Sequence, residues 1–198
     1  MVSCLLLAAG FSRRFGSPKA LALINGVTII EQLQSILIRS QVGEIVVVLG
    51  DHADDIKSHI LNHKKIKVVY NKDYNLGQTS SFKVGLEAIS TVALGVMLLP
   101  VDVPTIKVDT IDFLVNQFLL KRPPILIPTY NNIKGHPPIF NAIIKKTLLG
   151  MDNAVGLNTF EQERESDIVL LPVEDAGILR SFNTPEELEK IKAYLKYP

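Results

Sequence analysis

Residues 5–19, which read LLLAAGFSRRFGSPK, join an unbroken apolar run directly to a polar, cationic loop. Small residues at the junction allow the backbone to approach a ligand closely, and successive N–H groups that point the same way form a concavity for phosphate oxygens. The stretch therefore predicts a β-strand that leads into a nucleotide-phosphate loop. The small residues are Ala8, Ala9 and Gly10, and the cations that would balance phosphate charge are Arg13, Arg14 and Lys19.

Two well-known phosphate loops do not fit this stretch. A P-loop, G-x-x-x-x-G-K-[ST], has its lysine directly after the second glycine, whereas Lys19 stands three places after Gly16. A dinucleotide-binding loop, G-x-G-x-x-G, needs glycine at position 12, where this chain has Ser12. An ordinary strand with a basic surface loop stays open as the plain alternative.

Composition limits the class of protein. The chain has 198 residues, 47% of them hydrophobic, which is enough for one sizeable core and short for two full domains. A net charge of +1 provides no global field for nucleic acid or an anionic membrane. The single cysteine, Cys4, lies inside the first apolar run, which excludes a disulfide framework and a thiolate metal cluster and favours a reducing compartment.

The first residues, MVSCLLLAAG, do not predict a secretory signal, because no basic region precedes the short apolar core and the arginines follow it. No apolar run approaches the ~20 residues that a membrane-spanning helix needs. We therefore expect a soluble, cytoplasmic protein that binds neither nucleic acid nor membrane.

Short β-branched apolar runs alternate with longer amphipathic stretches, which predicts an α/β fold with a mainly parallel sheet covered on both faces. In such sheets the ligand lies beyond the carboxyl ends of the strands, so the loops that follow strands are the candidate site. The expected strands are 2–7, 44–49, 66–70, 95–99, 125–128 and 168–171, and the expected helices are 29–39, 53–62, 81–90, 110–120, 153–164 and 185–195.

Two of these loops contain notable polar residues. Residues 71–81, NKDYNLGQTSS, end in three hydroxyl side chains, one of which is expected to cap the following helix. Residues 100–105, PVDVPT, hold Asp102 between two prolines that remove backbone donors from its surroundings. A carboxylate at the end of a strand suits Mg²⁺, which commonly takes one or two protein carboxylates and fills its other positions with water and phosphates. An aspartate that only stabilises the turn is the alternative.

The last third of the chain is less regular. Residues 130–140, YNNIKGHPPIF, predict a turn or hairpin that leads to an edge strand, because Pro137 and Pro138 cannot donate to a strand ladder. For His136 a general base, a metal ligand and a surface residue all stay open. Further on, Thr184 is expected to cap the last helix, with Pro185 at its first position.

Residues 7–19 resemble, at nine positions, the opening signature of the MobA-like nucleotidyltransferases, L-A-[AG]-G-x-S-x-R-[MF]-G-x-x-K. Further family patterns fit 77–82, 99–104, 135–140 and 181–188, so the resemblance spans nearly the whole chain. It implies a Rossmann-like three-layer α/β/α nucleotidyltransferase fold of the GT-A type, in a single domain 1–198. The nucleotide-binding half would be 1–128, and the acceptor-binding and closing half 129–198.

The resemblance also implies roles for individual residues. Arg14, Lys19 and Asp102 would be catalytic, and Asp102 and Asn183 would hold Mg²⁺. Arg13 lies off the signature and is expected to matter much less. Ser181 replaces an acidic or amide residue of the pattern, which predicts a weaker metal site. Nucleotide contacts are assigned to Leu7, Ala8, Ala9, Gly10, Ser12, Gly77, Ser80 and Ser81, and acceptor contacts to Lys134, Gly135, His136 and Pro137.

Two features point to the cytidylyl-transferring MocA branch of the family: alanine rather than glycine at position 9, and the string GHPPIF. A methyl group where the backbone approaches the base favours a pyrimidine. We therefore expect transfer of an NMP, from CTP rather than GTP, to a phosphorylated acceptor of the molybdopterin type with release of pyrophosphate. A molybdoenzyme or its chaperone would be the protein partner. A sugar- or alditol-phosphate nucleotidyltransferase, an oxidoreductase and a non-catalytic nucleotide-binding accessory protein stay open.

Overall fold

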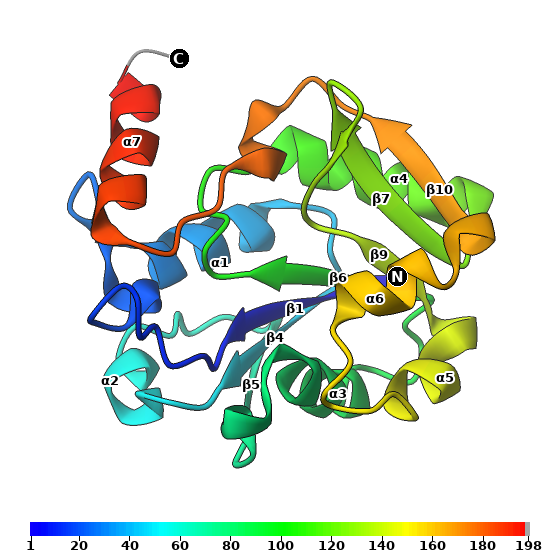
Figure 1. Ribbon diagram of the computed structural model, residues 1–198, viewed down its shortest axis with the longest axis horizontal. Coiled ribbons are helices and arrows are strands. Elements are labelled where there is room, and N and C mark those ends of the chain that lie inside the picture. Colours follow the sequence, from blue (N-terminus) through cyan, green and yellow to red (C-terminus); the bar gives the residue numbers. More distant parts are fainter. Residues whose placement is uncertain (197–198) are drawn as a thin grey trace.

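The strand β1 (Val2–Ala8) lies in the middle of the main sheet, and all seven of its residues are buried. It pairs in parallel with β4 (Glu44–Leu49) on one side and with β6 (Gly95–Pro100) on the other. Because both faces of this strand are covered, its sequence does not alternate, and apart from Ser3, which donates to Glu44, it is apolar. The computed structural model describes residues 1–196 and shows these strands crossing the centre of the fold (Figure 1).

The main sheet has eight strands in the order β10-β7-β9-β6-β1-β4-β5, with β8 paired to β7. Most neighbouring pairs are parallel, so the predicted α/β class with a mostly parallel sheet is confirmed. The remaining strands of this sheet are β5 (Ile66–Tyr70), β7 (Ile125–Tyr130), β8 (Ile133–Lys134), β9 (Ile139–Asn141) and β10 (Ile168–Pro172). A separate hairpin that the sequence did not predict consists of β2 (Leu23–Ile24) and β3 (Val27–Thr28).

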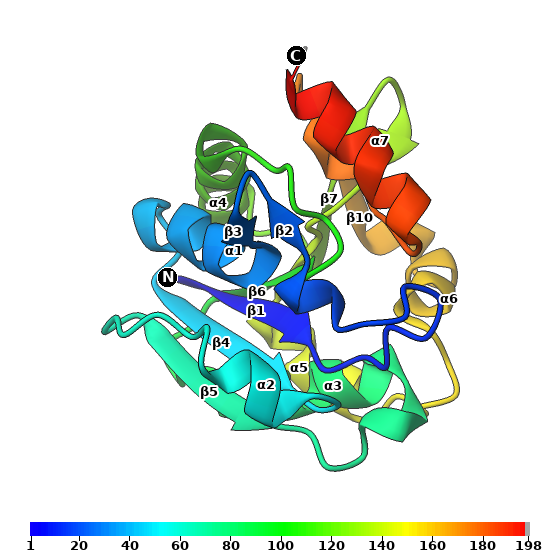
Figure 2. The same cartoon turned by 90° about the vertical axis from the view of Figure 1, so that its left-hand side faces the viewer.

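Helices cover both faces of the sheet (Figure 2). Successive strand residues point to opposite faces: Cys4 and Leu6 belong to the core under α1, α4 and α7, whereas Leu5 and Leu7 belong to the core over α3, α5 and α6. None of the described helices is long and apolar enough to cross a membrane. The helices are α1 (Ile29–Arg39), α2 (Ala53–Lys57), α3 (Gln78–Ala88), α4 (Val108–Lys121), α5 (Lys145–Leu149), α6 (Leu157–Gln162) and α7 (Pro185–Lys196).

Most predicted boundaries are close to those observed, and α1, β4 and β5 match the expected ranges. The helix predicted for 53–62 ends at Lys57 instead. Buried Gln34 accounts for this: its side chain donates to the carbonyl of His59 and accepts from the N–H of Leu61, which replaces helical hydrogen bonds. The helix predicted for 153–164 begins only at Leu157, because Asp152 Oδ1 accepts from the N–H of Ala154 and forms a turn there.

The prediction of an edge strand after the 130–140 turn was wrong. The hairpin itself is present, with Asn131 and Asn132 both at positive φ, as a tight two-residue β-turn requires. However, β9 lies inside the sheet, antiparallel to both β6 and β7. The two prolines precede this strand, and the carbonyl of Pro138 still accepts from the N–H of Leu98, so the prolines do not interrupt the ladder.

Candidate functional site

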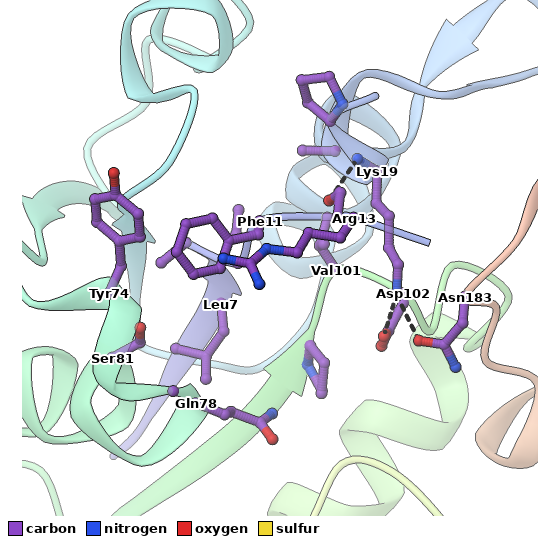
Figure 3. A pocket seen from close by; sticks show the side chains of 18 of the residues that line it. Leu7, Phe11, Arg13, Lys19, Tyr74, Gln78, Ser81, Val101, Asp102 and Asn183 are labelled. Carbon is purple, nitrogen blue, oxygen red and sulfur yellow. Dashed lines mark hydrogen bonds and ion pairs between the residues drawn. The ribbon is translucent and has the colours of Figure 1, made fainter. Parts of the chain in front are cut away.

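A cavity of about 530 Å³ opens at the carboxyl ends of β1 and β6, where an α/β sheet is expected to bind its ligand. Six parts of the sequence form its walls. They are the loop that follows β1, Ile56 of α2, the turn before α3 with the first turn of that helix, the loop after β6, His136, and the stretch before α7. Figure 3 shows the side chains of 18 of the residues that line it.

The loop after β1 folds around Ser12, which adopts a left-handed backbone conformation (φ 52°). Its carbonyl accepts from the N–H groups of Phe15 and Gly16 at 2.9 and 3.0 Å, and its Oγ accepts from the N–H of Lys19 at 3.1 Å. Gly16 has φ 81°, a conformation that glycine adopts without strain. Phe15 packs edge-on against fully buried Phe182, 5.3 Å between ring centroids, which attaches this loop to the segment before α7.

Arg14, Lys19, Asp102 and Asn183 meet at one end of the cavity. Figure 3 shows Lys19, Asp102 and Asn183 side by side there. Lys19 Nζ lies 3.0 Å from Asp102 Oδ2 and 2.9 Å from Asn183 Oδ1. Arg14 Nη2 donates to the same Asn183 oxygen at 2.9 Å. The carbonyl of Asp102 accepts from the N–H of Phe182 at 3.2 Å, which holds the β6 loop against the C-terminal segment.

Asp102 and Asn183 direct two oxygens at a single cation, which here is the Lys19 ammonium. Oxygen atoms of a carboxylate and an amide also suit Mg²⁺. Within residues 1–196, no group of three or more His, Cys, Asp or Glu side chains is arranged to hold a metal ion. Asp102 and Asn183 by themselves would therefore supply only part of the ligands of such an ion.

The loop before α3 differs from its predicted role in one respect. The helix begins at Gln78 with Gly77 at the N-cap position (φ 96°), so none of the three hydroxyl residues caps it. Asn71 Nδ2 instead donates to the hydroxyl oxygens of Ser80 and Ser81, each at 2.9 Å. Ser81 lines the cavity together with Gly77, whereas Ser80 lies behind its wall, 2.8 Å from the carbonyl of Gly77.

Of the four residues assigned to the acceptor, His136 lines the cavity. Its Nδ1 is buried and has no hydrogen-bond partner among the described residues. Burial lowers the pKa of the imidazole below its ordinary value, although the negative charge of Asp102 acts in the opposite direction. Gly135 and Pro137 pack behind it, and a Cβ on Gly135 would lie 2.7 Å from the carbonyl of Ile178. Lys134 is exposed and lies outside the cavity lining.

Several cavity residues have no counterpart among the sequence-based assignments. Phe11 and Tyr74 pack edge-to-face, with 5.2 Å between ring centroids, and the Arg13 guanidinium lies 4.3 Å from the Phe11 centroid. Asn75 and Gln78 complete this wall. The aromatic residues in the two loops were the available signal, but an isolated aromatic residue in a loop carries little information by itself.

The comparisons with known proteins agree with this geometry. Residues 4–168 match the MobA-like NTP transferase domain. The chain is 25% identical over 187 residues to the molybdenum cofactor cytidylyltransferase of Escherichia coli. This match covers 94% of this chain and 93% of that protein. It is also 25% identical over 201 residues to the nicotine blue oxidoreductase of Paenarthrobacter nicotinovorans, covering 96% of each. A solved nucleotidyl transferase from Methanothermobacter superposes with a TM-score of 0.83 at 20% identity, covering 100% of this chain and 99% of that one.

Proposed function

The chain belongs to the MobA-like NTP transferase family, and from this premise we propose that it transfers CMP from CTP to a phosphorylated small molecule and releases pyrophosphate. The observation that carries the proposal is the meeting of Arg14 and Lys19 with Asp102 and Asn183 at the end of β6. Two cations, one carboxylate and one amide oxygen at one end of a cavity suit a phosphate chain and its counter-ion.

The proposed reaction needs no nucleophile from the protein. An oxygen of the acceptor phosphate forms the new bond to the α-phosphorus. The bond between the α-phosphorus and the oxygen that bridges the α- and β-phosphates breaks, and that oxygen keeps the electron pair. Pyrophosphate leaves with those electrons. Arg14 and Lys19 would neutralise the charge that builds up on the phosphate oxygens, because fixed cations in a partly water-excluded site stabilise such a transition state.

We propose Mg²⁺ as the cofactor, held by Asp102 and Asn183. The two oxygens already converge on one ammonium group, so the donor set fits a small hard cation without rearrangement of the chain. When bound, the ion would reduce the negative charge on the phosphate groups. The Lys19 ammonium, which now contacts both oxygens, would be available to the phosphate oxygens beside the ion.

The choice of CTP rests on Ala9, which lines the cavity and is buried to 2% exposure. Gly50 packs closely against both Ala9 and Tyr74. A Cβ added to Gly50 would lie 2.9 Å from Ala9 Cβ and 2.7 Å from Tyr74 Cβ, which is too close for a side chain. This packing fixes the position of Ala9 in the cavity wall. A single methyl group contributes about 1–3 kcal/mol of discrimination, and the similarity to a cytidylyltransferase favours the same nucleotide.

For the acceptor we propose a molybdopterin-type cofactor, with a molybdoenzyme or its chaperone as the protein that receives the product. The support is the similarity to molybdenum cofactor cytidylyltransferase over most of both chains and the position of His136 in the cavity wall. A neutral imidazole with a free Nδ1 can accept or donate a hydrogen bond without adding charge beside Asp102.

The test is competition binding with equal concentrations of CTP, GTP, UTP and ATP in the presence of magnesium, followed by a pyrophosphate-release assay with candidate acceptors. CTP should bind in preference, and pyrophosphate should appear only with a phosphorylated acceptor. A preference for GTP or ATP would contradict the cytidylyl assignment. Redox turnover without pyrophosphate release would instead favour the oxidoreductase alternative, for which the similarity to nicotine blue oxidoreductase is the specific observation.

A further inference from the structure

Arg13 differs from the other two cations of the phosphate loop. Arg14 and Lys19 are both engaged by Asn183, and Lys19 also by Asp102. Arg13 lines the same cavity, but it forms no hydrogen bond or ion pair with any of residues 1–196. Its side chain is exposed, so an anion in the cavity could reach the guanidinium without displacing a partner.

The position of Arg13 is nevertheless defined by an aromatic support. Its Cζ lies 4.3 Å from the centroid of the Phe11 ring, within the range of a cation–π contact. Phe11 in turn packs edge-to-face against Tyr74, a half-buried residue that contacts the core between the sheet and α3. Figure 3 shows Phe11 and Arg13 between Tyr74 and the cluster of Lys19, Asp102 and Asn183.

Two successive arginines therefore serve different parts of the cavity. Arg14 is directed to Asn183, whereas Arg13 turns to Phe11. A nucleoside triphosphate and Asp102 together carry more negative charge than Arg14, Lys19 and the proposed Mg²⁺ can balance, because Asp102 compensates one of these positive charges. The additional charge resides on the β- and γ-phosphates, and these oxygens need a donor that is not already occupied. A planar guanidinium fits phosphate oxygens through two parallel hydrogen bonds.

We propose that Arg13, supported on Phe11, binds the β- and γ-phosphates of the substrate and hence the pyrophosphate product. This inference rests on the proposed nucleotidyl transfer, and it assigns to Arg13 a role in holding the leaving group. It differs from the expectation, based on the family signature, that Arg13 contributes little. The contact with Phe11 keeps the guanidinium away from Asp102 when no ligand is present.

The test is isothermal titration calorimetry with three probes, inorganic pyrophosphate, CTP and CMP, each in the presence of magnesium. Arg13→Ala should weaken the binding of pyrophosphate and of CTP by about tenfold or more, because charge-assisted hydrogen bonds are lost. CMP, which lacks both outer phosphates, should bind as it does to the wild type. Arg13→Lys and Phe11→Leu should give intermediate losses with pyrophosphate and CTP only.

The matched control is Arg39→Ala, which removes an exposed arginine on α1 whose Nε donates only to its own helix. It should leave all three affinities unchanged. Unchanged affinity of Arg13→Ala for pyrophosphate would overturn the role assigned to Arg13. An equal loss of affinity for CMP and CTP would also overturn it, and would indicate that the base contacts this wall. Failure of wild-type protein to bind pyrophosphate would also overturn it. A wild-type preference for another NTP would contradict only the cytidylyl assignment.

Discussion

Single side chains at the end of β6 determine what this cavity can bind. Asp102 is the one carboxylate in the cavity lining of the described chain, and its Oδ2 contacts Lys19 Nζ with both side chains partly exposed, 26% and 12%. Both side chains are mostly shielded from water, and the cost of desolvating the two charges offsets much of their attraction, so the ion pair is weak evidence for a contribution to folding stability. The pair is therefore better explained by a role in binding than by a role in stability.

We expect Asp102→Asn to abolish nucleotidyl transfer and to leave the melting temperature close to that of the wild type. The substitution preserves volume and removes the charge that would hold the metal. Pyrophosphate release and a thermal melt, measured on the same preparation, check both parts. Turnover within about tenfold of wild type, which is ~1.4 kcal/mol of barrier, would exclude Asp102 as an essential ligand.

Glu161 on α6 provides a prediction for pH. Burial raises the pKa of this carboxyl above its ordinary value of 4.5, and the positive charge of Lys134 only partly opposes that effect. Because the folded-state pKa lies above the unfolded one, the folded protein binds the proton more tightly, and the ionised group destabilises the fold once the pH is above its folded-state pKa.

Glu161→Gln should therefore raise the melting temperature at pH 7 to 8, and the advantage should shrink as the pH falls toward the ordinary carboxyl range. Glu163→Gln, at an exposed position just beyond the same helix, is the control and should show no such pH dependence. The measurement is a series of thermal melts between pH 4 and 8. An advantage for Glu161→Gln that persists at the acid end would show that it comes from packing rather than from charge.

At the scale of elements, the alternation of apolar and amphipathic runs predicted nearly all strands of the sheet, because that pattern reports burial directly. It failed where a distant side chain replaced local hydrogen bonds, as Gln34 does beyond α2. It also failed for β9, because the sequence does not show that a three-residue strand lies between two long ones. In both places the outcome depends on contacts between residues far apart in the chain.

The start of α4 depends on a residue outside that helix. Asp175 is buried, its Oδ2 accepts from the N–H of Lys107 at 3.0 Å and from Thr110 Oγ1 at 2.8 Å, and its Oδ1 accepts from the N–H of Gly177 at 2.9 Å. Asp175→Ala would leave the buried donors of Thr110 and Gly177 without this partner, together with the N–H of the more exposed Lys107.

We expect Asp175→Ala to lower the free energy of unfolding by about 2–4 kcal/mol, since hydrogen bonds to a charged acceptor are lost and the donors of Thr110 and Gly177 stay buried. Asp175→Asn, which keeps part of the geometry, should lose less. Asp109→Ala in the exposed first turn of α4 is the control and should change stability little. Urea unfolding measures all three, and a loss in Asp175→Ala no larger than in the control would disprove the capping role.

At the scale of the whole molecule, the cavity depends on segments from both ends of the chain. The family signature located Arg14, Lys19, Asp102 and Asn183, and the structure brings these four together. The family signature did not reveal the wall of Phe11, Arg13 and Tyr74. This wall forms where two loops meet, and the sequence of one loop does not indicate that the other lies beside it.

A ligand that binds the assembled cavity should stabilise the whole fold. An NTP with magnesium at a hundred times its dissociation constant should add about 2.7 kcal/mol to the free energy of unfolding and raise the melting temperature by several degrees. Lys19→Ala, which removes the ammonium between Asp102 and Asn183, should reduce this shift. Differential scanning fluorimetry with each NTP checks the prediction, and an equal shift in wild type and Lys19→Ala would mean that the nucleotide binds elsewhere.

The contact between Phe182 and the loop after β6 has a consequence for synthesis on the ribosome. Strands β1, β4, β5 and β6 all precede residue 101, so this part of the sheet can pair while translation continues. Phe182 and Asn183, which complete the cavity, emerge much later. We expect a nascent chain halted before residue 181 to contain Lys19 and Asp102 without their amide partner, so that only a chain translated past Asn183 can engage nucleotide.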